Sequence, residues 1–230
     1  MHVSNVYQHY FFHYMSSTPT IIRRSRMVRV KKQINMDTSA TLRISRVLLT
    51  GRPGIGKTTI CKELISMMNK ENYNLEGFYT EEVRDQVGSR IGFDVALVNR
   101  SGDKSTLARI EDVINQSQRS KYKVGKYHVF LNNFEEMALP IFDSNADILI
   151  IDEIGKMELF SQKFHDQVLK LFSKNFSKPF IIATIPETHK APHKYLPLFQ
   201  QLCTDKKSKL ITVNHHNRNT LPEEIFRMIS

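Results

Sequence analysis

The stretch Gly51-Arg-Pro-Gly-Ile-Gly-Lys-Thr58, followed by Thr59, decides the fold of this 230-residue chain. It matches the pattern G-x-x-x-x-G-K-[ST], whose glycines let successive backbone N–H groups turn inward around a phosphate. A short apolar run, Arg46-Val-Leu-Leu-Thr50, comes immediately before it and indicates a strand. Apolar residues at helical spacing follow as far as Lys70. A strand, a glycine loop and a helix in this order predict a phosphate-binding loop (P-loop).

Each part of this loop has an expected role in holding a triphosphate. The ammonium group of Lys57 is expected to reach the β- and γ-phosphates, and the hydroxyl of Thr58 to ligate Mg²⁺. The positive end of the helix dipole adds to the attraction for anions. The residues expected to bind the nucleotide are Gly51, Arg52, Pro53, Gly54, Ile55, Gly56, Lys57, Thr58, Thr59 and Arg218.

Arg218 belongs to this set for a different reason. It lies in the polar loop Asn214–Asn219 that follows the last predicted strand, where P-loop folds often place the nucleotide base. A guanidinium stacked on the ring would suit loose base selection, because every base offers a π-face. A solvated arginine fits the sequence equally well, so both interpretations stay open.

A second stretch, Ala146-Asp-Ile-Leu-Ile-Ile-Asp152-Glu153, joins an apolar run to two terminal carboxylates. The uninterrupted run predicts a central parallel strand that is buried on both faces. Asp152 at its end is placed to hold the Mg²⁺ shell through water, as in Walker B strands. Glu153 stands one step further, where a carboxylate can orient and deprotonate an attacking water. We therefore predict that Glu153 is a hydrolytic base, in preference to a helix-terminal charge or a solvated loop residue.

Three more polar side chains lie close to this region. Lys156 either reaches the γ-phosphate and neutralises transition-state charge, or is an ordinary surface lysine. Glu158 is expected to cap the helix that follows. Thr184, at the end of the buried run 179–184, either senses phosphate or holds water, or is a plain β-branched strand residue. The predicted catalytic set is Lys57, Glu153 and Lys156, and the predicted metal ligands are Thr58 and Asp152.

Charge is unevenly distributed along the chain. Residues 1–46 carry eight Lys or Arg and one acidic residue, a net charge of +7, which leaves +3 of the total +10 for the remainder. The core is nearly balanced, so nucleic acid is not an expected partner there and is considered only for the basic arm. We predict that residues 1–44 form a disordered basic extension and residues 45–230 a single P-loop domain.

Composition also bears on the compartment and on membranes. No apolar run reaches membrane-spanning length, so no membrane partner is predicted. Cys61 and Cys203 are expected to be free thiols in a reducing compartment. A cytoplasmic location is predicted, with mitochondria as the alternative because the acid-poor basic arm resembles a transit segment. A monomer is favoured.

Strands alternate with helices through residues 45–230, which predicts an α/β fold: a three-layer P-loop sandwich around a mostly parallel sheet. Residues 75–83 and 90–97 flank a turn and predict an added antiparallel hairpin. The other predicted strands are 106–110, 124–130, 179–184 and 209–213. The other predicted helices are 133–142, 159–172, 195–203 and 223–228.

Together these segments resemble one family, the P-loop nucleoside-triphosphatases of thermophilic prokaryotes and, in animals, the cancer-related nucleoside-triphosphatase. The resemblance covers residues 46 to about 228 and is most specific in Gly77-Phe-Tyr-Thr-Glu-Glu-Val-Arg84 and Ile151-Asp-Glu-Ile-Gly-Lys-Met-Glu158. It implies Mg²⁺-dependent hydrolysis of nucleoside triphosphates to diphosphate and phosphate, with broad base tolerance. The resemblance implies that Lys57 binds phosphate and that Thr58 binds the metal. It also implies that Asp152 and Glu153 lie where the triphosphate is cleaved. The basic arm departs from the family pattern, which begins just before the first strand.

Two other classes of function share the P-loop. A small nucleotide or nucleoside kinase would need an acceptor pocket and an Arg-rich lid, and no Arg-dense insertion follows Asp152. A carboxylate at Glu153 also favours water as the acceptor. A non-enzymatic nucleotide switch that associates with nucleic acid is suggested only by the basic arm.

Overall fold

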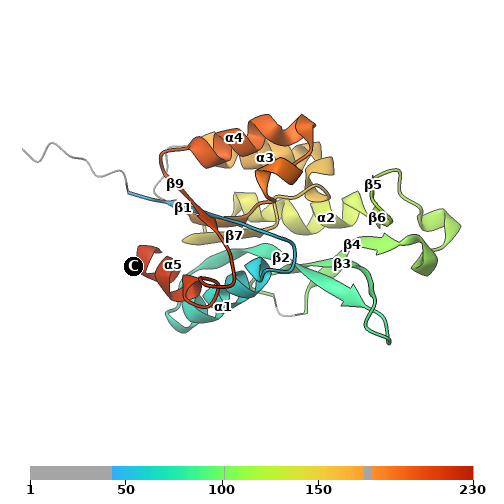
Figure 1. Cartoon of the computed structure of the whole chain (residues 1–230), viewed down its shortest axis with the longest axis horizontal. Helices are drawn as coiled ribbons and strands as arrows, with labels where there is room; N and C mark the ends of the chain where they lie inside the picture. The colour runs from blue at the N-terminus through green and yellow to red at the C-terminus, as the bar shows by residue number, and fades with distance from the viewer. Residues whose placement is uncertain (1–42, 101, 174–177, 230) are drawn as a thin grey trace, which may run out of the picture. The chain divides into compact units, whose positions relative to one another are not determined.

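The computed structural model describes residues 43–100, 102–173 and 178–229. The predicted extension 1–44 therefore lies, apart from Arg43 and Ile44, outside the described residues. Within them the chain forms a nine-stranded sheet with the order β5-β6-β4-β3-β2-β7-β8-β1-β9 (Figure 1).

One half of the sheet is parallel, as the alternation of strands and helices predicted. Its strands are β2 (Leu75–Arg84), β7 (Ile148–Asp152), β8 (Phe180–Thr184), β1 (Arg46–Thr50) and β9 (Ser208–Thr212). Leu49 of β1 pairs with Thr184 of β8, and Ile151 of β7 pairs with Ala183. The carboxyl ends of β1, β7 and β8 therefore meet at one edge of the sheet, which is where α/β folds bind ligands.

The other half is antiparallel and begins with the predicted hairpin of β2 and β3 (Arg90–Leu97). It continues through β4 (Lys104–Ile110), β6 (Tyr127–Val129) and β5 (Lys123–Val124). The prediction of one strand over 124–130 was wrong. Gly125 has a φ of 58° and turns the chain, so that β5 and β6 form a small hairpin instead.

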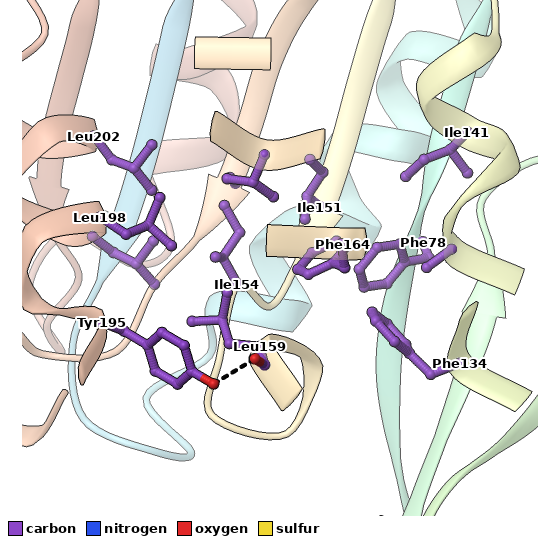
Figure 2. Packing of buried hydrophobic residues seen from close by; sticks show 14 of the residues in the cluster. Phe78, Phe134, Ile141, Ile151, Ile154, Leu159, Phe164, Tyr195, Leu198 and Leu202 are labelled. Atoms are coloured by element: carbon purple, nitrogen blue, oxygen red, sulfur yellow. Dashed lines mark hydrogen bonds between the residues drawn. The ribbon is translucent and has the colours of Figure 1, made fainter. Parts of the chain in front are cut away.

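Helices cover both faces of the sheet (Figure 1). On one face lie α1 (Lys57–Lys70) and α5 (Leu221–Ile229), and on the other α2 (Leu131–Ala138), α3 (Gln162–Ser173) and α4 (Leu196–Thr204). Each interface has its own buried apolar cluster. On the α2–α3 side, Phe134 packs edge-on against Phe78 and Phe164, with ring centroids 5.5 and 5.1 Å apart (Figure 2). The three-layer α/β fold is thus confirmed.

Two helices differ from their predicted bounds for local chemical reasons. α2 ends at Ala138 because Pro140, which has no backbone N–H, begins a 3-10 turn over Pro140–Asp143. The predicted helix 159–172 is a 3-10 turn over Glu158–Phe160 followed by α3. Ser161 separates the two, because its hydroxyl accepts the Phe164 N–H at 3.1 Å and caps α3.

No helix within the described ranges is long and apolar enough to cross a membrane.

Candidate active site

The P-loop connects β1 to α1 and wraps around the ammonium group of Lys57. Gly51, Gly54 and Gly56 all have φ values between 75° and 147°, a backbone conformation that favours glycine. Lys57 is 8% exposed, and its Nζ donates to the Gly51 carbonyl at 3.0 Å. Ile55 is buried against the α1 side of the sheet and anchors the middle of the loop. The loop therefore surrounds a fixed positive charge at the start of a helix, which suits an anion.

The remaining predicted loop residues lie on the outside of this turn. Arg52, Pro53 and Gly54 are exposed, as is Thr59 in the first turn of α1. Thr58 is half-buried, and its hydroxyl forms a hydrogen bond with Asp152. The two predicted metal ligands, which are far apart in the sequence, are thus brought together at the carboxyl edge of the sheet.

Asp152 is the last residue of β7 and is 1% exposed. Its Oδ1 accepts the hydroxyl of Thr184 at 2.5 Å. Its Oδ2 has no hydrogen-bond partner among the described residues, although it is buried. Burial raises the pKa of Asp152, while hydrogen bonds from Thr184 and Thr58 and the charge of Lys57 lower it. One oxygen of a buried carboxylate is therefore held and the other is left for a further ligand.

Glu153 follows directly, and the peptide bond between Asp152 and Glu153 is cis. Its side chain is half-buried. Burial raises its pKa, the charge of Lys57 lowers it, and the charge of Asp152 raises it again. A carboxylate that is partly desolvated beside a lysine and a second carboxylate has the electrostatic setting of a proton acceptor.

Glu158 is the residue whose surroundings the sequence did not indicate. It is 4% exposed, and its carboxyl accepts its own backbone N–H and that of Gly155. Glu158 thus lies in the first turn of the 3-10 segment as an acidic residue, but the residue that caps α3 is Ser161 and not Glu158 as predicted. Burial and the nearby charge of Glu153 also raise its pKa to about 8. Two acidic residues five positions apart, on either side of Gly155, were the signal that could have suggested the pairing.

Lys156 and Arg218 are both exposed. Lys156 lies on the turn between Glu153 and Glu158. Arg218 follows β9, in a loop where the Asn217 side chain bonds the Asn214 N–H and the Thr212 carbonyl. The Arg218 Cδ lies 3.9 Å from the position that a methyl group on Gly56 would occupy. The predicted base-contacting arginine is thus next to the P-loop.

The comparison with known proteins extends over the same residues. A protein-family model described as NTPase matches residues 46–226. The chain belongs to this NTPase family.

Members of this family are similar to the chain over most of their length. A cancer-related nucleoside-triphosphatase homolog from Bos taurus is 40% identical over 186 residues, which cover 78% of this chain and 93% of that protein. A nucleoside-triphosphatase THEP1 from Thermotoga sp. (strain RQ2) is 36% identical over 187 residues, which cover 80% and 95%.

A solved member of the family has the same fold. The crystal structure of THEP1 from the hyperthermophile Aquifex aeolicus superposes with a TM-score of 0.63 at 32% identity, covering 80% of this chain and 99% of that one. The expected family resemblance is therefore confirmed.

Proposed function

We propose that the chain is a Mg²⁺-dependent nucleoside-triphosphatase that cleaves the β–γ anhydride bond with water as the acceptor. Its relatives are named nucleoside-triphosphatases, which supports this class of reaction. The observation that carries the proposal is the position of Glu153 directly after Asp152, beside the charge of Lys57. A carboxylate at that point has no role in holding phosphate and suits the activation of water.

The oxygen atoms around Asp152 fit a magnesium ion. Mg²⁺ prefers hard oxygen ligands and usually keeps several of its waters. The Thr58 hydroxyl would be one such ligand, and the buried, unpartnered Oδ2 of Asp152 would hold a metal-bound water. The ion would neutralise charge on the β- and γ-phosphates. Thr184, by donating to Oδ1, fixes which oxygen of Asp152 faces that ion.

The residues of the chain divide the chemical step between them. The P-loop N–H groups and Lys57 hold the phosphates, while Glu153 orients the water and takes its proton as the oxygen attacks the γ-phosphorus. The bond from the γ-phosphorus to the bridging oxygen breaks, and the diphosphate leaves with that oxygen. Lys156 is proposed to offset charge on the transferring group, as arginine fingers do.

Base tolerance is proposed to follow from the loop around Arg218. An exposed guanidinium beside Gly56 can stack on any base without reading its edges. We therefore expect ATP, GTP, CTP and UTP all to be substrates.

A kinase activity of the same site is the alternative, and one experiment separates the two. Phosphate release from each of the four triphosphates is measured with Mg²⁺, with and without added nucleoside monophosphates. Hydrolysis of all four that is unaffected by the monophosphates supports the proposal. Transfer of the phosphate to an added monophosphate, with little free phosphate, would reject water as the acceptor.

A further inference from the structure

The turn that carries Glu153 is fixed at both of its ends. Ile154 is fully buried and Leu159 is 2% exposed, so both side chains pack into the core beneath the turn (Figure 2). The Leu159 N–H donates to the Gly155 carbonyl at 3.0 Å. The hydroxyl of Tyr195, from the segment before α4, donates to the Leu159 carbonyl at 2.5 Å (Figure 2). The backbone between Glu153 and Leu159 therefore has little freedom to move.

The side chain of Glu158 also holds this turn together. Its carboxyl accepts the backbone N–H of Gly155, so the side chain at the end of the turn holds the backbone at its beginning. Removal of the Glu158 side chain would therefore leave the Gly155 N–H without this acceptor.

Gly155 lies between the two carboxyl groups. A methyl group added there would come within 2.7 Å of Glu158 Oε2 and 2.9 Å of Glu153 Oε1. Distances this short are not tolerated, so a side chain at position 155 would displace one carboxyl or both. Gly155 does not have a positive φ. Glycine is therefore needed at this position only because a larger side chain does not fit.

We propose that Gly155 and Glu158 are positioning residues that hold the Glu153 carboxylate against the attacking water. The inference rests on the proposed function of Glu153 and adds how its geometry is maintained. Both carboxyl groups border the space that a side chain at position 155 would fill, so Glu158 and the missing side chain of Gly155 together limit where the Glu153 carboxylate can lie. Because burial raises the pKa of Glu158 to about 8, its carboxyl is mostly neutral at pH 7 and tolerates the nearby Glu153 charge.

Steady-state kinetics at saturating Mg²⁺ test the proposal. A displacement of about 1 Å in a catalytic group costs up to about 10²-fold in rate, so Glu158→Ala is expected to lower kcat by roughly 10- to 100-fold. The KM for ATP is expected to change by less than about threefold, because the P-loop is intact. Glu158→Gln keeps a carbonyl acceptor and nearly the same volume, and is expected to restore most of kcat. Glu136→Ala, an exposed carboxylate on α2, is the matched control.

A double-mutant cycle asks whether Glu158 acts through Glu153. In the Glu153→Gln background, Glu158→Ala is expected to cause no further loss of kcat. A further loss as large as in wild type would show that Glu158 supports the whole fold or the phosphates instead, and would overturn the proposal. If Glu158→Ala does not fold, Gly155→Ala takes its place in the cycle with the same expected outcomes.

The failure of this inference is distinguishable from that of the proposed function. Wild-type kcat in folded Glu158→Ala and Gly155→Ala, with activity lost in Glu153→Gln, overturns the positioning role alone. Wild-type kcat in Glu153→Gln itself overturns both.

Discussion

Replacing Glu158 by Gln is expected to stabilise the folded protein by an amount that grows with pH. The pKa of Glu158 is raised from 4.5 to about 8 in the folded chain, by burial and then by the charge of Glu153. The folded state therefore keeps a proton that the unfolded state releases above pH 4.5. The contribution of this group to stability is fully present below pH 4.5 and is lost as the pH rises to about 8.

The expected size follows from that shift. One pH unit within the window changes the free energy of unfolding by about 1.4 kcal/mol, so wild type should lose about 2–3 kcal/mol between pH 5 and pH 7 through this residue. Gln has the shape of the neutral acid and does not titrate. The difference in unfolding free energy, Glu158→Gln minus wild type, should therefore rise by the same amount.

Urea unfolding at pH 5, 6 and 7 measures this difference, with Glu136→Gln as an exposed control. The control should differ from wild type equally at all three pH values. If the difference for Glu158→Gln were also constant, the raised pKa of Glu158, which its burial and the nearby charge of Glu153 cause, would be refuted.

The remaining predictions concern the metal, the core and the base. Thr184→Val removes the hydroxyl that bonds Asp152, so the Mg²⁺ concentration for half-maximal phosphate release should rise about tenfold; an unchanged Mg²⁺ titration would contradict the role given to Thr184. Phe164→Ala empties a fully buried site between Phe78 and Phe134 and should cost about 3–5 kcal/mol in urea unfolding, whereas a loss below about 1 kcal/mol would not fit this packing. Arg218→Ala should raise the KM for all four triphosphates by about three- to tenfold with kcat unchanged, and a change confined to one base would argue against stacking.

Much of the fold follows from local patterns in the sequence. The strand before Gly51 and the two continuous apolar runs, 148–152 and 180–184, are found where they were predicted, because a strand buried on both faces leaves an unambiguous pattern. The breaks at Gly125 and Ser161 were missed. In each case a single turn or cap residue interrupts a pattern that otherwise continues across it.

The parts of the site that lie within the two sequence motifs could be predicted from the sequence. The pairing of Thr58 with Asp152 follows from the P-loop and the adjacent parallel strand. The bond from Thr184 to Asp152 depends on the register of β8 against β7, which the sequence does not encode locally. The sequence also did not predict the burial of Glu158, because burial depends on how distant segments pack together and not on the residues beside it in the chain.

The most direct test of the account is a comparison of Glu153→Gln with wild type in two measurements on the same preparations: binding of ATP with Mg²⁺, and release of phosphate. Binding is expected to change by less than about threefold, and phosphate release is expected to fall at least about 100-fold, since removing a general base costs about 10²–10⁴-fold. Glu136→Gln should match wild type in both measurements. Phosphate release at the wild-type rate from folded Glu153→Gln would contradict the claim that this carboxylate activates the water.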